Sequence, residues 1–347
     1  MRAAVICGLG GSLPPRVVTN DELAQRLDTS DDWIRSRTGI GRRHVVDPGT
    51  TTSHLAAEAG LRALKSSGHN TVDLVVLATT TPDRTCPGTA PTVAARMGLT
   101  DVPAYDVSAV CSGFVYALQA GAGAIAAGFA ERVMVIGAES FSTILSPDDR
   151  TTSVIFGDGA GAVVLRAGEP DEPGAIQHFD LGSDGSLADL ITVRGGGAEQ
   201  RSSGSPAKPE DSYFRMDGKS VFFAAVRRMA ESSRAVLAKT GWEIDDVDRL
   251  VAHQANIRII HAVAEQLGLP PDKALMNIER VGNTSAASIP LALVDGVACG
   301  SLKAGDRVLL TAFGGGATWG SASLTWPALS PELTQPIENA VPLLTAH

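Results

Sequence analysis

The segment ERVMVIGA (131–138) decides the fold class, because it is a continuous apolar run that recurs as DRVLLTAF (306–313). Runs of this kind are typical of strands that are buried on both faces of a sheet. Two further pairs of segments repeat in the same order along the chain: VDL with VDRL (72–74 and 247–250) and AARMGL with AEQLGL (94–99 and 264–269). One match arises easily by chance, but three in one order predict two similar halves.

Other short apolar runs predict strands, and alanine-rich segments with helical spacing separate them. The expected strands are 74–78, 133–137, 162–165, 250–252 and 308–311, and the expected helices are 53–65, 89–97, 113–127 and 221–239. This alternation indicates an α/β protein with mostly buried sheets. At roughly 150 residues per domain, the chain of 347 residues corresponds to about two domains, which we place at 1–175 and 176–347.

Two segments lack this pattern. Residues 182–211 are rich in Gly, Ser, Pro and charge, which predicts a surface loop or insertion. The tail from Trp326 contains several prolines and predicts a loose extension.

Composition and charge exclude several functional classes. The net charge of -9 argues against a uniformly basic nucleic-acid binder. No apolar run reaches the roughly 20 residues that a membrane span needs, and the start of the chain lacks a full signal peptide. The four cysteines show no metal-ligand spacing, so we expect no metal site and a reducing, cytoplasmic location.

Cys111 is the first candidate for chemistry, in the segment DVSAVCSGF (106–114). A strand is expected to end here and a helix to open at or just after the cysteine. The positive end of a helix dipole lowers the pKa of a thiol, which predicts a reactive thiolate. The competing interpretation is a buried, inert cysteine.

Three other segments place polar or exposed groups at strand ends. His253 follows a strand in LVAHQANIRI (250–259), where α/β proteins place their sites, although a core histidine fits an isolated His better. Asn283 follows a glycine in VGNTSAASIP (281–290), where a plain helix N-cap is the competing interpretation. Gly314 to Gly316 expose backbone N–H groups that can form an oxyanion hole or only a tight turn.

At these residues the chain resembles the β-ketoacyl-acyl carrier protein synthase III family of the thiolase-like superfamily. The segments that carry the resemblance are DTSDDWIRSRTGI (28–40), the cysteine segment CSGF (111–114), FGDGAGAVVL (156–165), HQANIRI (253–259), GNTSAASIP (282–290) and FGGGATWGS (313–321). The resemblance covers roughly residues 3–325. Within the family, the chain looks most like the priming ketosynthases of aromatic polyketide pathways.

The resemblance implies a five-layered αβαβα fold built from two duplicated halves, and a homodimer. It implies a catalytic triad of Cys111, His253 and Asn283, and an oxyanion hole made by the backbone N–H groups of Cys111 and Gly315. Acyl-CoA would load the cysteine, and malonyl-acyl carrier protein would then condense with the acyl group and lose CO₂. No metal or redox cofactor is implied.

The resemblance also implies binding residues. For coenzyme A it places the adenine between Trp33 and Arg150, with Arg37 and Thr38 in the same motif. Trp33 could instead pack on the surface of an amphipathic turn.

For the acyl group, the pocket-closing Phe that a partner subunit supplies in acetyl-selective members aligns with Cys86. A smaller side chain predicts a starter longer than acetyl, unless Phe141 refills the space; Phe156 is the other expected pocket residue.

Carrier proteins are acidic, so a basic docking patch is expected on this acidic enzyme. Arg258 fits the docking position of the family, whereas a familiar lysine position holds Phe223. Arg227, with Arg228, could substitute for it.

Two alternatives remain open. The same acyl-enzyme could pass its acyl group to a carrier, alcohol or amine without condensation. A non-catalytic partner subunit is the other class, but such subunits lack the nucleophile.

Overall fold

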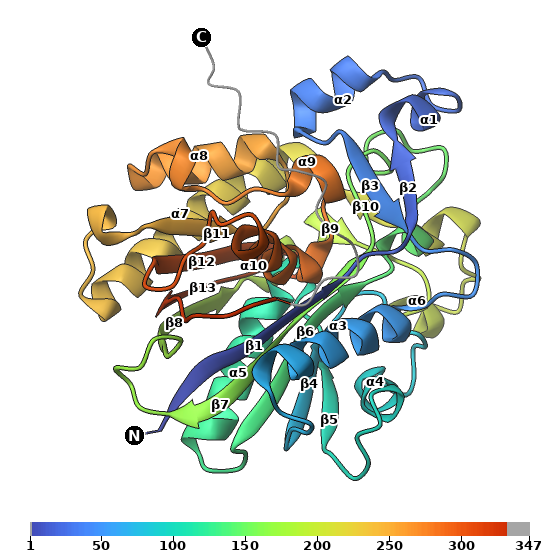
Figure 1. Cartoon of the computed structure of the whole chain (residues 1–347). Helices are drawn as coiled ribbons and strands as arrows, with labels where there is room; N and C mark the ends of the chain where they lie inside the picture. The colour runs from blue at the N-terminus through green and yellow to red at the C-terminus, as the bar shows by residue number, and fades with distance from the viewer. Residues whose placement is uncertain (1, 332–347) are drawn as a thin grey trace.

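The structure is a computed structural model that describes residues 2–331 (Figure 1). Two sheets form its frame. The first has the strand order β1-β7-β6-β4-β5, formed by β1 (Ala3–Ser12), β7 (Gly159–Gly168), β6 (Arg132–Glu139), β4 (Leu74–Ala78) and β5 (Ala104–Val107). The second has the order β11-β12-β13-β8, formed by β11 (Arg249–Ala252), β12 (Arg307–Gly314), β13 (Thr318–Thr325) and β8 (Ile176–Ser183).

The two sheets repeat one pattern of strand directions. In the first, β6 pairs antiparallel with β7 and parallel with β4; in the second, β12 pairs antiparallel with β13 and parallel with β11. β1 and β8 pair antiparallel with β7 and β13 at equivalent edges. An isolated parallel bridge between Leu250 and Ala274 occupies the place that β5 has in the first sheet. The repeated segments 131–138 and 306–313 lie in the equivalent strands β6 and β12, and the predicted α/β architecture of two similar halves is confirmed.

Helices fill three layers around the sheets (Figure 1). The helices α3 (Thr52–Ser67) and α4 (Ala90–Arg96) cover the outer face of the first sheet. The helices α7 (Gly218–Thr240) and α8 (Ile257–Leu267) cover the outer face of the second. Between the sheets lie α5 (Gly113–Ala126) and α10 (Ser288–Ala298), which contact strands of both. The boundary expected at residues 175/176 falls between β7 and β8, and its placement stays a prediction.

Local sequence explains these elements. All five residues of β4, LVVLA, are buried, as a central strand with parallel neighbours on both sides requires. The helices α3 and α7 both end where a glycine, Gly68 or Gly241, adopts a left-handed conformation with φ near 70°. Asn256 caps α8 by accepting a hydrogen bond from the Ile259 N–H at 2.9 Å.

Smaller elements lie beside this frame (Figure 1). They are β2 (Arg16–Thr19), α1 (Asn20–Ala24), α2 (Asp31–Thr38), β3 (Arg42–Val45), β9 (Ile191–Thr192), α6 (Ala198–Ser202), β10 (Arg215–Met216) and α9 (Ile278–Val281). Of these, α1, α2, β2 and β3 lie at the upper right of the view in Figure 1. β2 pairs with β3 and contacts α1, α1 contacts α2, and α2 in turn contacts α8. This arrangement places α2 beside the start of α8, at the rim of the site described below.

Two expectations need correction. Residues 182–211 are not only a surface loop, because β9 within them pairs with β10 and Ile191 packs inward. The polar composition of the segment hides this short apolar stretch.

Trp326 is not part of a loose extension: it is 1% exposed, and its backbone N–H donates to the Asp306 carbonyl at 2.7 Å. The rest of the expected tail from residue 332 lies outside the described residues.

Candidate active site

Cys111 lies at a sharp turn between β5 and α5, in the 3₁₀ turn Val110–Ser112. Val110 has φ of +47°, a strained value for a β-branched residue, and such strain is commonly found at functional sites. Gly314 packs directly behind the turn, since a Cβ there would lie 2.8 Å from the Cys111 backbone nitrogen. Only a glycine at the end of β12 therefore allows the two halves to meet at the cysteine.

The buried thiol of Cys111 favours its protonated form. Its pKa is raised to about 12, mainly by burial and in part by the negative charge of the nearby Glu139 carboxylate. The expectation that the helix dipole lowers this pKa is therefore wrong, because desolvation of a 7% exposed thiol outweighs it. The enzyme must remove the thiol proton during the reaction itself.

His253 follows β11 directly and is 3% exposed. Burial lowers its pKa to about 3, so the imidazole is neutral near pH 7. Its Nδ1 lies 2.6 Å from the Ser288 hydroxyl oxygen at the start of α10. If that hydroxyl donates to Nδ1, the ring proton resides on Nε2.

Asn283 is held by its backbone and by its side-chain oxygen. Its backbone N–H donates to the Ile155 carbonyl at 2.9 Å, and its carbonyl accepts from the Gly157 N–H at 3.0 Å. The side-chain Oδ1 accepts from the Ser285 N–H at 2.9 Å, which leaves the Nδ2 protons for a ligand. The N-cap of the following 3₁₀ turn is Thr284, so Asn283 is not merely a helix cap.

A buried hydrogen-bond chain joins Cys111 to the first sheet, and sequence reasoning missed it. The Cys111 thiol lies 3.6 Å from Ser285 Oγ, which donates to Glu139 Oε1 at 3.0 Å. Glu139 ends β6 and is 0% exposed. The signal was a carboxylate directly after an apolar strand, and a serine two residues after Asn283.

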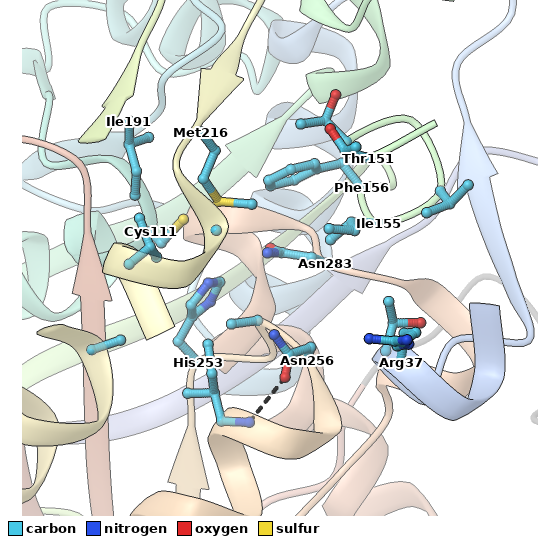
Figure 2. Close-up of a pocket in the computed structure, with 18 of the residues that line it drawn as sticks. Arg37, Cys111, Thr151, Ile155, Phe156, Ile191, Met216, His253, Asn256 and Asn283 are labelled. Carbon is cyan, nitrogen blue, oxygen red and sulfur yellow. Dashed lines mark hydrogen bonds between the residues drawn. The ribbon is translucent and has the colours of Figure 1, made fainter. Parts of the chain in front are cut away.

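These groups meet at one end of a cavity of about 270 Å³ (Figure 2). Figure 2 shows Cys111, His253 and Asn283 around a common space, with Arg37 of α2 at the far end. Between the two ends the wall is mostly apolar, formed by side chains that include Val154, Ile155, Phe156, Ile191, Phe214, Met216 and Met229. The structure therefore brings together all three expected catalytic residues, at the bottom of an apolar passage.

The rim of the cavity holds the residues expected to bind coenzyme A. Trp33, Arg37 and Thr38 line it, and the guanidinium groups of Arg37 and Arg150 lie 5.9 and 5.5 Å from the centre of the Trp33 ring. A flat base stacked between Trp33 and Arg150 needs about 7 Å, twice the usual contact distance. Arg150 is about half exposed and also binds Asp28, so an outward movement of its side chain would open the space.

The three residues expected in the acyl pocket are in different places. Phe156 lines the cavity, and Phe141 stacks on it from behind at 4.2 Å between ring centres. Phe141 is fully buried and does not itself form the wall. Cys86 is exposed and lies outside this cavity, so a contact with the pocket of a partner subunit stays a prediction.

The glycine turn places Gly314, rather than Gly315, against the cysteine backbone. A Cβ on Gly315 would instead lie 3.0 Å from the Ile191 side chain. The oxyanion role expected for the N–H groups of Cys111 and Gly315 stays a prediction.

The expected docking residues lie on the outer helices near the rim. Arg258 is exposed in the first turn of α8. Arg227 is exposed on α7 and lies 4.0 Å from Glu231, one helical turn away. Phe223, on the same helix, is 64% exposed. Arg228 is less available, because its guanidinium packs 4.4 Å from the centre of the Trp319 ring.

No group of three or more His, Cys, Asp or Glu side chains within residues 2–331 is arranged to hold a metal ion. None of the helices described is long and apolar enough to cross a membrane.

The comparisons with known proteins match this geometry. The model of the 3-oxoacyl-[acyl-carrier-protein] synthase III family matches residues 105–185, and the model of the C-terminal part of that synthase matches residues 237–326. A relative from Streptomyces coelicolor, beta-ketoacyl-[acyl-carrier-protein] synthase III 3, is 60% identical over 95% of this chain and 99% of its own length.

Solved structures agree. The 3-oxoacyl-(acyl carrier protein) synthase III of Pseudomonas aeruginosa superimposes with a TM-score of 0.89 at 51% identity, over 95% of this chain and 100% of that one. A priming beta-ketosynthase from a polyketide biosynthetic pathway superimposes with a TM-score of 0.87 at 32% identity, over 95% and 98% of the two chains. The fold is thiolase-like, and the chain belongs to the β-ketoacyl-[acyl-carrier-protein] synthase III family of condensing enzymes.

Proposed function

We propose that this enzyme loads an acyl group from acyl-CoA onto Cys111 and then condenses it with malonyl-acyl carrier protein, which loses CO₂. The observation that carries the proposal is the convergence of Cys111, His253 and Asn283 at the end of an apolar cavity. The rim of that cavity bears Trp33 and Arg37, an aromatic face and a cation suited to a nucleotide with phosphates.

In the first half-reaction the Cys111 sulfur attacks the thioester carbonyl, and the CoA thiolate leaves. The acyl chain then occupies the apolar part of the cavity, which favours it by removing its methylene groups from water. A malonyl thioester enters next.

In the second half-reaction neutral His253 and the Asn283 amide each donate a hydrogen bond to the malonyl thioester oxygen. Ser288 favours this role, because a hydroxyl that donates to Nδ1 keeps the imidazole proton on Nε2. Donors aimed at a developing oxyanion lower the barrier to decarboxylation, and the resulting carbanion attacks the acyl group on Cys111. This chemistry needs no metal or redox cofactor.

We further propose a starter longer than acetyl, a role in priming polyketide synthesis and a homodimeric enzyme. The priming ketosynthase among the structural relatives supports the priming role. The exposed Cys86 is free to contact a partner subunit, which supports both the homodimer and a wider acyl pocket. The cytoplasmic location stays a prediction.

Release of CO₂ separates condensation from simple acyl transfer. Labelled malonyl-acyl carrier protein is added to enzyme already loaded from butyryl-CoA, with unloaded enzyme as the control. The proposal predicts CO₂ and a β-ketoacyl-carrier protein in equal amounts. Transfer of the intact acyl group without CO₂ would contradict it.

A further inference from the structure

Glu139 is a buried carboxylate that the proposed reaction does not yet use. Its hydrogen-bond partners among the described residues are all neutral donors: the Thr80 N–H, the Thr81 hydroxyl at 2.7 Å and the Ser285 hydroxyl at 3.0 Å. The titratable group that faces it is Cys111, beyond Ser285. A carboxylate held in this way, with no cation among these partners, is costly to bury, and buried groups of this kind are common at functional sites.

The backbone is built to keep Ser285 between the thiol and the carboxylate. Ser285 has φ of +48°, a value that non-glycine residues rarely adopt. A Cβ on Gly137 of β6 would lie 2.3 Å from the Ala286 carbonyl oxygen, so only glycine lets this turn approach the strand that ends in Glu139. Two hydrogen bonds then run in one direction, from Cys111 to Ser285 and from Ser285 to Glu139.

We propose that Ser285 and Glu139 form a proton relay for Cys111. This inference rests on the proposed function and deepens it. As the sulfur–carbon bond to the acyl group forms and the bond to CoA breaks, the thiol proton moves to Ser285 Oγ while the Ser285 proton moves to Glu139. The departing CoA thiolate takes its proton from water. During condensation the Cys111 thiolate leaves the acyl group and recovers its proton from Glu139 through Ser285.

The relay assigns different tasks to the two halves of the site. Burial raises the pKa of Glu139 to about 7 and lowers that of His253 to about 3, so the carboxylate is the stronger base. If His253 took the thiol proton on Nε2, its ring would have to change tautomer before donating a hydrogen bond to the malonyl thioester. With Glu139 as proton acceptor, His253 keeps one tautomer through the whole cycle.

The test is the pH dependence of Cys111 alkylation by iodoacetamide, followed by intact mass between pH 5.5 and 9.5. In the wild-type enzyme the proton moves within the relay, so the rate should rise to about pH 7 and then stay flat. In Glu139→Gln the thiol must lose its proton to water, so the rate should rise tenfold per pH unit. At pH 7 we expect the variant to be about 100-fold slower.

A merely electrostatic or structural role predicts a different result. Removing the negative charge of Glu139 would by itself lower the pKa of Cys111 and accelerate alkylation. An alkylation rate in Glu139→Gln that is equal to or faster than wild type, with a flat profile above pH 7, would overturn the relay.

Two further variants distinguish loss of the relay from misfolding. Ser285→Gly removes the hydroxyl and tolerates the positive φ, and should give the same sloping profile as Glu139→Gln. Asp158→Asn is the matched control, because Asp158 is also a fully buried carboxylate but accepts hydrogen bonds from Ser142 and Val46 instead. It should keep the wild-type profile; a sloping profile in it would mean that any buried carboxylate produces the effect, and would overturn the relay.

Alkylation needs no acyl-CoA, so this test is independent of the proposed function. One outcome is a wild-type alkylation rate that is flat above pH 7, loss of this plateau in Glu139→Gln and Ser285→Gly, and no acyl adduct from any acyl-CoA. That outcome would support the relay and contradict the proposed function. Acyl adducts together with a wild-type alkylation rate that keeps rising above pH 7 would support the proposed function and contradict the relay.

Discussion

The side-chain oxygen of Asn283 accepts a hydrogen bond from the backbone N–H of Ser285 at 2.9 Å, and this contact fixes the two ends of the amide. The oxygen is bound within the protein, and the NH₂ group is left for the substrate. One short segment thus orients a donor for the malonyl thioester through Asn283 and contacts the nucleophile through Ser285.

Replacing Asn283 by Asp separates these roles. The carboxylate can still accept from the Ser285 N–H, but it has no proton to donate to the thioester oxygen. We expect condensation to slow by about 10²–10³-fold, while loading of Cys111 from acyl-CoA stays within a few-fold of wild type. Single-turnover measurements of acyl-enzyme formation and of CO₂ release give the two rates. Equal losses in both steps would contradict the assignment.

His253 should make stability depend on acid. Its pKa is about 3 in the folded protein and near 6.5 when exposed, so between these values only the unfolded chain binds the proton. The free energy of unfolding should therefore fall with decreasing pH by about 1.4 kcal/mol per unit from this group alone. Urea unfolding of wild type and His253→Ala at pH 7, 6 and 5 checks this. The stability difference should shift steadily toward the variant below pH 6.5, and parallel curves would refute it.

Cys86 tests the predicted starter length. Cys86→Phe should close the acyl pocket across the proposed dimer interface. Because several methylene groups of the longer starter are then excluded, kcat/KM for hexanoyl-CoA should fall relative to that for acetyl-CoA by at least about tenfold. The wild-type enzyme should prefer butyryl-, isobutyryl- or hexanoyl-CoA to acetyl-CoA. An acetyl preference in wild type, or an unchanged ratio in the variant, would show that Cys86 does not limit the pocket.

Arg258 and Arg227 test the docking surface. Arg258→Glu and Arg227→Glu should raise KM for malonyl-acyl carrier protein about five-fold or more at low salt, because each replaces attraction with repulsion. Loading from acyl-CoA should not change. Lys303→Glu is a suitable control: it is exposed in the turn before β12, whereas the site lies where that strand ends. An unchanged KM in both arginine variants would place the docking surface elsewhere.

The central strands were predictable because each is a short, continuous run of apolar residues. LVVLA at 74–78 forms β4 with the expected bounds, and the repeated ERVMVIGA and DRVLLTAF segments lie in equivalent strands. The grouping of Cys111, His253 and Asn283 was expected only from the resemblance to the family, because each residue taken alone also fits an inert cysteine, a core histidine or a helix cap. The pairing of β9 with β10 was not predictable, because Ile191 stands in a polar stretch and its partner is distant in sequence.

The sequence alone could not predict the hydrogen-bond chain from Cys111 to Glu139 or the raised pKa of the Cys111 thiol. Glu139 and Ser285 are 146 positions apart, and they meet only because β6 and the turn after Asn283 pack together. The pKa of Cys111 depends on how deeply the folded protein buries it, which a helix N-terminus in the sequence does not reveal. Both the contact between Ser285 and Glu139 and the burial of Cys111 arise only when the chain has folded.

The most direct test of the account is the intact mass of the protein after brief incubation with a panel of acyl-CoAs, beside Cys111→Ala. We expect a stable adduct of one acyl group in the wild-type protein, largest for a starter of more than two carbons and absent from the variant. An adduct that persists in Cys111→Ala, or no adduct from any acyl-CoA, would contradict Cys111 as the acyl-CoA-loaded nucleophile.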